Sequence, residues 1–125
     1  MAKLVTPEEF KAMVKKARKP KPDYLPAMIR ICELLKLPLP LPEFKFAAPD
    51  RKWAVDFFIA PYLLVEVDGG LFSGGRHGRG AGRREDIRKH NHAVAMGYNV
   101  VTVLSEWFKS GEAMSVIEKA YERHF

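Results

Sequence analysis

Three acidic residues interrupt two short apolar segments of the sequence. Asp56 stands between a valine and two phenylalanines, and Glu66 and Asp68 alternate with valines about ten residues later. Carboxylates in apolar strands repel one another strongly unless a cation relieves the repulsion. Hard divalent cations such as Mg²⁺ and Mn²⁺ take oxygen ligands of this kind. We therefore expect Asp56, Glu66 and Asp68 to form a metal site, with Mg²⁺ or Mn²⁺ as the cofactor.

The expected geometry depends on the turn between the two segments. With a three-residue turn at 60–62, antiparallel pairing places Asp56 opposite Glu66, and facing residues have Cβ atoms ~4.5–5.5 Å apart. Asp68 then lies on the same face as Glu66, because side chains alternate along a strand. A turn of two or four residues would shift the register by one and separate Asp56 from Glu66. The acids would then be ordinary surface charges.

A helix expected at about 84–96 brings further polar side chains toward these acids. One of its faces carries residues at helical spacing, namely Asp86, Lys89, His90 and Ala93. Lys89 could therefore be presented to the acids. The alternative is that Lys89 only pairs with Asp86 or Glu85. We expect Ile87 and Val94 to form the apolar face of this helix.

Positive charge is concentrated in two blocks of a chain whose formal net charge is +6. Residues 1–22 contain seven Lys or Arg against two Glu, and residues 76–90 contain six against two acids. Such blocks suit contact with a phosphate backbone, although a solvated tail and a solvated helix face are the alternative. The residues expected to contact such a backbone are Lys15, Lys16, Arg18, Lys19, Arg76, Arg79, Arg83 and Arg84.

The bulk composition indicates a single soluble domain. The chain has 125 residues, of which 47% are hydrophobic, and no apolar run approaches the ~20 residues that a membrane span needs. The N-terminus lacks the pattern of a secretory signal, so we expect a cytoplasmic location and no membrane partner. The single cysteine, Cys32, excludes an internal disulfide and a cysteine-based zinc site.

The elements that must position these residues form a mixed α/β pattern. We expect helices at about 6–17, 26–37, 84–96 and 111–123, and strands at about 43–47, 52–59, 62–68 and 99–104. Thr6 and Glu9 are spaced as a capping box for the first helix. Residues 69–82 contain seven of the nine glycines. We interpret this stretch as a segment that closes over DNA, with plain flexibility as the alternative.

Several motifs together resemble the PD-(D/E)XK nuclease superfamily. They are Glu43–Phe46, Trp53–Phe57, Glu66–Gly70, Gly75–His77, Asp86–Asn91 and Gly97–Val101. More specifically, the string resembles a phage-encoded branch that is similar to very-short-patch-repair endonucleases and to archaeal-type Holliday junction resolvases. The resemblance spans roughly residues 26–106. It implies a restriction-endonuclease-like core, α-βββ-α-β, in a nuclease domain over 25–125, with a basic N-terminal helical arm and linker over 1–24 and an extra C-terminal helix.

The sequence departs from this superfamily at Asp68, where the family has a lysine. That lysine orients the attacking water or steadies charge in the transition state, so Lys89 and His77 are the candidates to replace it. The alternative for His77 is a polar loop residue. The resemblance to resolvases also implies that Glu33 can join the metal site, the alternative being a solvated helical acid near Lys36.

The resulting prediction is a metal-dependent, structure-selective DNA endonuclease. The resemblance points to a Holliday junction resolvase that makes paired incisions in four-way junctions as a homodimer, acting in recombination and repair. A mismatch-repair-type or site-specific nicking endonuclease and a catalytically inactive nucleic-acid-binding module are the alternatives. Candidate residues for the dimer surface are Leu39, Leu41, Trp107, Phe108, Met114, Ile117 and Tyr121, unless they pack into the core of their own chain.

Overall fold

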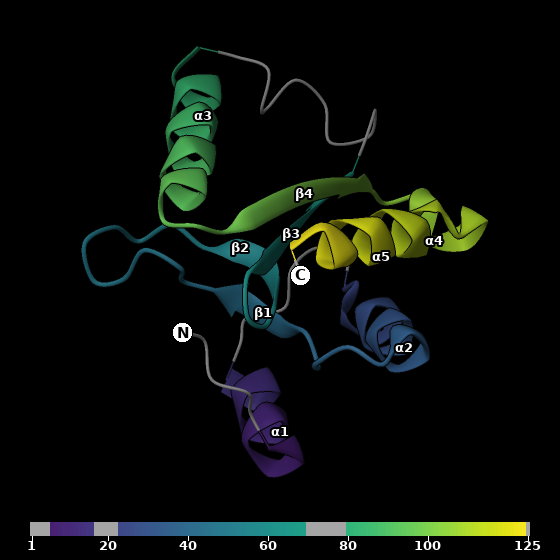
Figure 1. Ribbon diagram of the computed structural model, residues 1–125. Coiled ribbons are helices and arrows are strands. Elements are labelled where there is room, and N and C mark those ends of the chain that lie inside the picture. The colour runs from purple at the N-terminus through teal and green to yellow at the C-terminus, as the bar shows by residue number, and fades with distance from the viewer. Residues whose placement is uncertain (1–5, 17–22, 70–79, 125) are drawn as a thin grey trace.

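The computed structural model of the chain describes residues 6–16, 23–69 and 80–124 (Figure 1). In chain order its elements are α1 (Pro7–Lys16), α2 (Leu25–Leu35), β1 (Leu41–Phe44), β2 (Val55–Ile59), β3 (Leu63–Asp68), α3 (Gly80–Ala95), β4 (Asn99–Leu104), α4 (Trp107–Ser110) and α5 (Glu112–His124). This is the predicted order with a short additional helix, α4. The predicted positions Arg18, Lys19, Arg76, His77 and Arg79 lie outside the described residues, as do the side chains of Lys15 and Lys16.

The four strands form one mixed sheet in the order β1-β2-β3-β4. β2 pairs antiparallel with both β1 and β3, whereas β3 and β4 run parallel. The β2–β3 register pairs Phe57 with Val65 and Ile59 with Leu63, which confirms the three-residue turn at 60–62. Continued by one residue, this register brings Asp56 to the position opposite Glu66.

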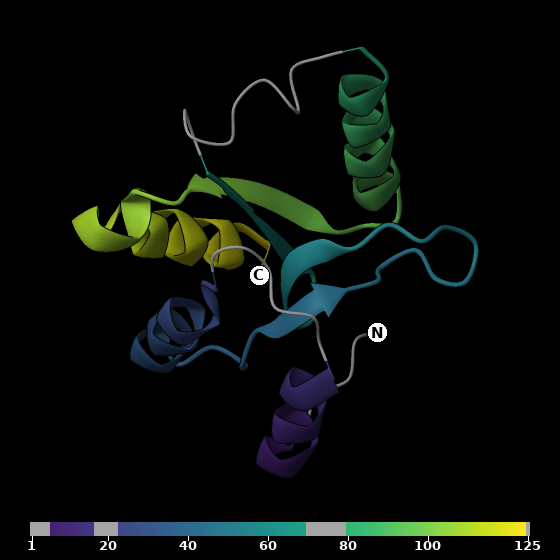
Figure 2. The ribbon, with the colours of Figure 1, turned by 180° about the vertical axis from the view of Figure 1, so that it is seen from behind.

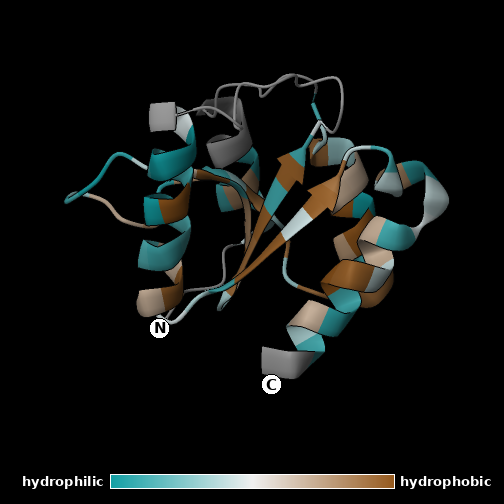
Figure 3. Ribbon diagram, turned by 90° about the horizontal axis from the view of Figure 1, so that it is seen from above, coloured by the Kyte–Doolittle hydropathy of each residue, from teal (hydrophilic) through white to brown (hydrophobic). Residues whose placement is uncertain are grey.

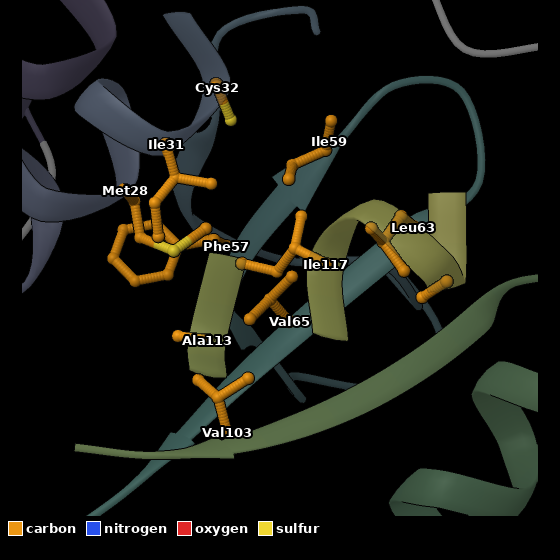
Figure 4. Packing of buried hydrophobic residues seen from close by; sticks show 11 residues of the cluster. Met28, Ile31, Cys32, Phe57, Ile59, Leu63, Val65, Val103, Ala113 and Ile117 are labelled. Carbon is orange, nitrogen blue, oxygen red and sulfur yellow. The ribbon is translucent and has the colours of Figure 1, made fainter. Parts of the chain in front are cut away.

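The main core lies between the sheet and the helices α2 and α5. Phe57 and Val65 point to this side of the sheet and are fully buried, together with Met28 of α2 and Ile117 of α5. Figure 4 shows these side chains gathered between the strands and the two helices. Because β2 and β3 are buried, the acids that these strands carry are held on a rigid, apolar base.

The helix α3 lies on the other side of the sheet from α2 and α5 (Figures 1 and 2). Figure 3 shows that α3 is largely hydrophilic, in contrast to the hydrophobic strands beside it. Its packing face carries Ala93, which is 1% exposed, whereas Ile87 and Val94 are about half exposed. The predicted apolar face of this helix was therefore wrong. A small alanine lets the helix approach the sheet closely, and bulky side chains would hold it away.

The N-terminal helix is tied to the sheet rather than extended from it. Besides the main core, the chain has a second hydrophobic cluster, in which Phe10 of α1 is buried with Leu41 of β1. The capping box is present as predicted: the N–H of Glu9 donates to Thr6 Oγ1 at 3.1 Å, and the N–H of Thr6 donates to Glu9 Oε1 at 2.9 Å. The division of the chain at residue 24 stays a prediction.

The side chains predicted for a dimer surface are packed within the chain. Ile117 and Leu41 are buried, and the other candidates are partly buried against the two clusters: Leu39, Trp107, Phe108, Met114 and Tyr121. Leu41 and Ile117 therefore belong to the chain's own core, as the alternative expects, and the other five remain candidates. Among the helices of the described residues, none combines the length and the apolar character needed to cross a membrane.

The buried Cys32 gives a test of the core. Burial raises the pKa of its thiol to about 12, with a smaller contribution from the negative charge of Glu33. At pH 8 the reactive thiolate should thus be only about one part in ten thousand. We expect Cys32 in the folded protein to resist a chromogenic disulfide reagent and to react at once in denaturant. A cysteine introduced at the exposed Ser115 is the control. Rapid reaction of the native wild-type thiol would contradict the packing of α2.

Candidate active site

A cavity of about 230 Å³ lies between α3 and the strands β3 and β4. Its polar lining consists of Glu66, Asp68, Asp86, Lys89, His90 and Thr102. The remaining lining is mainly apolar and includes Val55 and Ala93. The cavity therefore sets carboxylates, one ammonium group and one imidazole against an apolar floor, where charge interactions are stronger than in water.

The central interaction of the cavity joins α3 to β3. Lys89 Nζ donates to Glu66 Oε1 at 3.0 Å, and the two side chains are 23% and 29% exposed. Lys89 does not pair with Glu85, which instead forms an ion pair with Arg88 at 3.3 Å. The helix α3 thus brings the ammonium group of Lys89 to Glu66, although the two residues are 23 positions apart in the sequence.

Asp56 lies beside Glu66 and is oriented by the neighbouring strand. Its Oδ2 accepts a hydrogen bond from the backbone N–H of Val67 at 2.7 Å. Its charge acts on Glu66 electrostatically, and the Asp56 backbone also hydrogen-bonds with the Glu66 carboxylate. These contacts bring Asp56 and Glu66 together at the end of the β2–β3 ladder.

The environment of Glu66 raises the pKa of its carboxyl group. Burial is the largest cause, and the charge of Asp56 adds to it. Lys89 acts in the opposite direction through its charge and its hydrogen bond. Glu66 is therefore an acid whose ionised form is costly in the folded protein and depends on a nearby cation.

A cluster of side chains fastens α3 to the loop before β2. Trp53 Nε1 donates to Glu85 Oε2 at 2.8 Å. The Trp53 ring also meets the His92 ring edge-on, with 5.4 Å between centroids, and the guanidinium of Arg51 lies 5.4 Å from the Trp53 ring. Glu85 and His92 flank Lys89 on α3, so this cluster helps to set the position of the lysine over the sheet.

The predicted metal ligands are not gathered into one group. Within the described ranges, no three His, Cys, Asp or Glu side chains lie close enough together to hold a metal ion. Asp68 is exposed at the rim of the cavity. Glu33 is exposed on α2, which packs on the opposite side of the sheet from α3, and it does not line the cavity. Arg83 and Arg84 are exposed on α3.

Three polar residues of the cavity were not predicted as site residues. Thr102 enters from β4, and Asp86 and His90 enter from α3. The helical spacing that placed Asp86 and His90 on the face of Lys89 was the available signal, and all four residues of that face line the cavity. For Thr102 the signal was weaker, because its place beside Glu66 depends on the parallel register of β3 and β4.

Comparison with known proteins identifies the fold. No protein-family model and no curated protein matches the chain. Among solved structures, the chain is similar to the catalytic domain of the homing endonuclease I-Bth0305I, with a TM-score of 0.61 and 17% sequence identity. The similarity covers 87% of this chain and 99% of that domain. The predicted mixed α/β core is thus confirmed as similar to that of a nuclease catalytic domain.

The ion pair predicts a specific pH dependence of stability. Lys89→Met should raise the pKa of Glu66 further, because the ammonium group lowers it. When the pKa of an acid is higher in the folded than in the unfolded chain, ionisation of that acid opposes folding. The free energy of unfolding then decreases as the pH rises from the pKa of the unfolded chain to that of the folded chain. Relative to wild type, the free energy of unfolding of the variant should therefore fall as the pH rises from the pKa of Glu66 in the wild-type protein to its higher pKa in the variant.

Urea denaturation with chelator present measures this difference without any metal. Lys109→Met removes the same charge from an exposed position on α4 and is the matched control. Plotted against pH, the free energy of unfolding of this control should run parallel to that of wild type. If Lys89→Met also ran parallel, the proposed coupling between Lys89 and Glu66 would be wrong.

Proposed function

We propose that this chain is a metal-dependent DNA endonuclease and that the cavity between α3 and the sheet is its active site. The observation that carries the proposal is the pairing of the half-buried Glu66 with Lys89, with Asp56 beside them, on a nuclease-like fold. A carboxylate pair with an adjacent ammonium group suits phosphodiester hydrolysis, in which negative charge builds up on the phosphate.

The acids fit a hard divalent cation in charge and in donor type. Glu66, Asp68 and Asp86 present carboxylate oxygens to one cavity, and Asp56 adds a charge next to Glu66. We assign Asp56, Glu66 and Asp68 as the residues that would hold Mg²⁺ or Mn²⁺. Glu33 is not included, because it lies on α2 and does not line this cavity. The cation would supply Lewis-acid stabilisation of charge at the scissile phosphate.

Lys89 takes the place of the family lysine that is missing at Asp68. From α3 its ammonium group reaches Glu66 at 3.0 Å, so it can contact a phosphate oxygen or orient a water molecule beside that acid. His77 is proposed as a general acid or base, because imidazole changes its protonation state near neutral pH.

The basic residues are proposed to bind the DNA backbone without reading bases. Arg83 and Arg84 are exposed on the helix that also carries Lys89, which places positive charge near the cavity. Arg76 and Arg79 precede them in the chain. Lys15, Lys16, Arg18 and Lys19 would extend the contact from the N-terminal block.

For the substrate, we propose four-way-junction DNA cut at paired positions by a homodimer. One chain carries one candidate site, so two coupled incisions need two copies. The motif resemblance to resolvases supports this choice. The likeness to a homing endonuclease domain favours a site-specific cut in duplex DNA as the second candidate.

Two conservative substitutions test the active site. Asp56→Asn and Glu66→Gln keep the side-chain shape but remove a charge, so each should lower cleavage at least about a hundredfold with DNA binding nearly unchanged. The matched controls are Asp50→Asn and Glu118→Gln, which change exposed acids away from the cavity. Near-normal turnover by either site variant would contradict the proposed active site.

A substrate panel separates the candidate specificities. Cleavage in Mg²⁺ or Mn²⁺ should be fastest on a four-way junction, compared with a flap, a mismatch and plain duplex of the same sequence. On a supercoiled cruciform, paired cutting should yield linear product within one binding event. Nicking of a mismatch or of one duplex sequence, with no preference for junctions, would favour a repair-type or site-specific enzyme. If none of these substrates were cleaved, the remaining candidate would be a catalytically inactive nucleic-acid-binding module.

A further inference from the structure

The strand β4 forms one edge of the sheet, and half of its backbone groups point outward. Asn99 and Ser105 donate their N–H groups to the carbonyls of Tyr62 and Asp68, at 2.8 and 2.9 Å. Since alternate residues of a strand direct their peptide groups to the same side, Val100, Thr102 and Leu104 direct theirs away from β3. In the part of the chain that the structure describes, no strand pairs with that side of β4.

This edge lacks the features that usually protect an exposed strand. Residues 99–104, Asn-Val-Val-Thr-Val-Leu, contain no charge, no proline and no glycine. The strand is six residues long and regular, with every residue in register with β3. In Figure 1 it lies along the side of the sheet that faces the viewer, and no ribbon passes in front of it. Soluble proteins usually blunt such an edge or pair it with another strand.

We propose that the β4 edge is the interface at which two copies of this chain associate. An antiparallel β4–β4 pair centred on Thr102 places Thr102 opposite its own counterpart. The same register sets Val100 against Leu104 and Val101 against Val103. Every cross-strand pair between residues 100 and 104 is then threonine with threonine or apolar with apolar, and such pairs stabilise antiparallel ladders. The sequence of this strand is therefore self-complementary about a two-fold axis.

The surfaces beside β4 are compatible with a second copy. On the α5 side, a groove is lined by Asn99, Val101, Val116, Lys119, Ala120 and Glu122. A two-fold interface brings a patch against the same patch of the partner, so a patch with a single charge sign repels itself. This groove carries one cation and one anion and is self-complementary. On the other side, the half-exposed Ile87 and Val94 of α3 offer apolar surface for a partner to cover.

The interface would join the two sheets into one of eight strands. Both cavities would open on the same side, because Thr102 lines its own cavity and meets its counterpart at the axis. Strands lie ~4.8 Å apart, so the two β3 strands that carry Glu66 would be separated by ~14 Å. This arrangement suits paired incisions, a consequence that rests on the proposed function. The interface itself does not depend on cleavage.

Oligomeric state in the absence of DNA tests the interface separately from the nuclease activity. Light scattering and sedimentation equilibrium should show a dimer for wild type. Thr102→Lys sets two like charges against each other at the axis and should weaken the dimer at least about fivefold. Thr102→Val keeps the shape and should dimerise like wild type. Circular dichroism checks that both variants fold. A monomeric wild type, or equal association by all three proteins, would overturn the proposal.

Disulfide trapping tests the register. Residues that form a hydrogen-bonded antiparallel pair have Cα atoms ~5.5 Å apart, within the ~4.4–6.8 Å range of disulfides. Thr102→Cys should thus form an intermolecular disulfide under mild oxidation. Leu104→Cys should not, because the two copies of residue 104 would be more than ~14 Å apart. The wild-type chain, with only buried Cys32, controls for other cross-links. Equal cross-linking of both variants, or of neither, would contradict this register.

Discussion

The parallel pairing of β3 with β4 forces the intervening chain to cross one face of the sheet. Two parallel strands cannot be joined by a tight turn, so residues 69–98 must leave the end of β3 and return to the start of β4. The helix α3 makes that return on the side of the sheet opposite to α2 and α5. This crossing brings Lys89 above Glu66. The cavity and its ion pair are thus consequences of strand direction.

The crossing helix is held more by polar contacts than by burial. Ala93 is its one residue that is almost fully buried among those described. The contacts of Glu85 and His92 with Trp53, and that of Lys89 with Glu66, hold the helix at successive turns. The side of the cavity that α3 forms is therefore held by charge and aromatic contacts. The acids, in contrast, lie on β2 and β3, which are packed into the core.

Local patterns in the sequence predicted the fold and part of the candidate site. The turn at 60–62 fixed the β2–β3 register, and helical spacing placed Asp86, Lys89, His90 and Ala93 on one face, as observed. The predicted apolar face of α3 was wrong, and two of the proposed dimer residues, Leu41 and Ile117, are buried in the core. Periodicity shows which residues are apolar and not which surface covers them. Ile87 is exposed while Ile117 is buried. Lys89 pairs with Glu66 and not with Glu85. Helical spacing could not decide between these two partners, because the contact with Glu66 joins distant parts of the sequence.

The two halves of the candidate site differ in how the chain must fold to assemble them. Asp56 and Glu66 meet across a hairpin, which needs only a short loop to close. Glu66 and Lys89 meet only when β4 docks on β3, which closes a loop of about thirty residues and costs more chain entropy. Contacts between distant parts of a chain generally slow folding. By this argument the two carboxylates come together before Lys89 reaches Glu66.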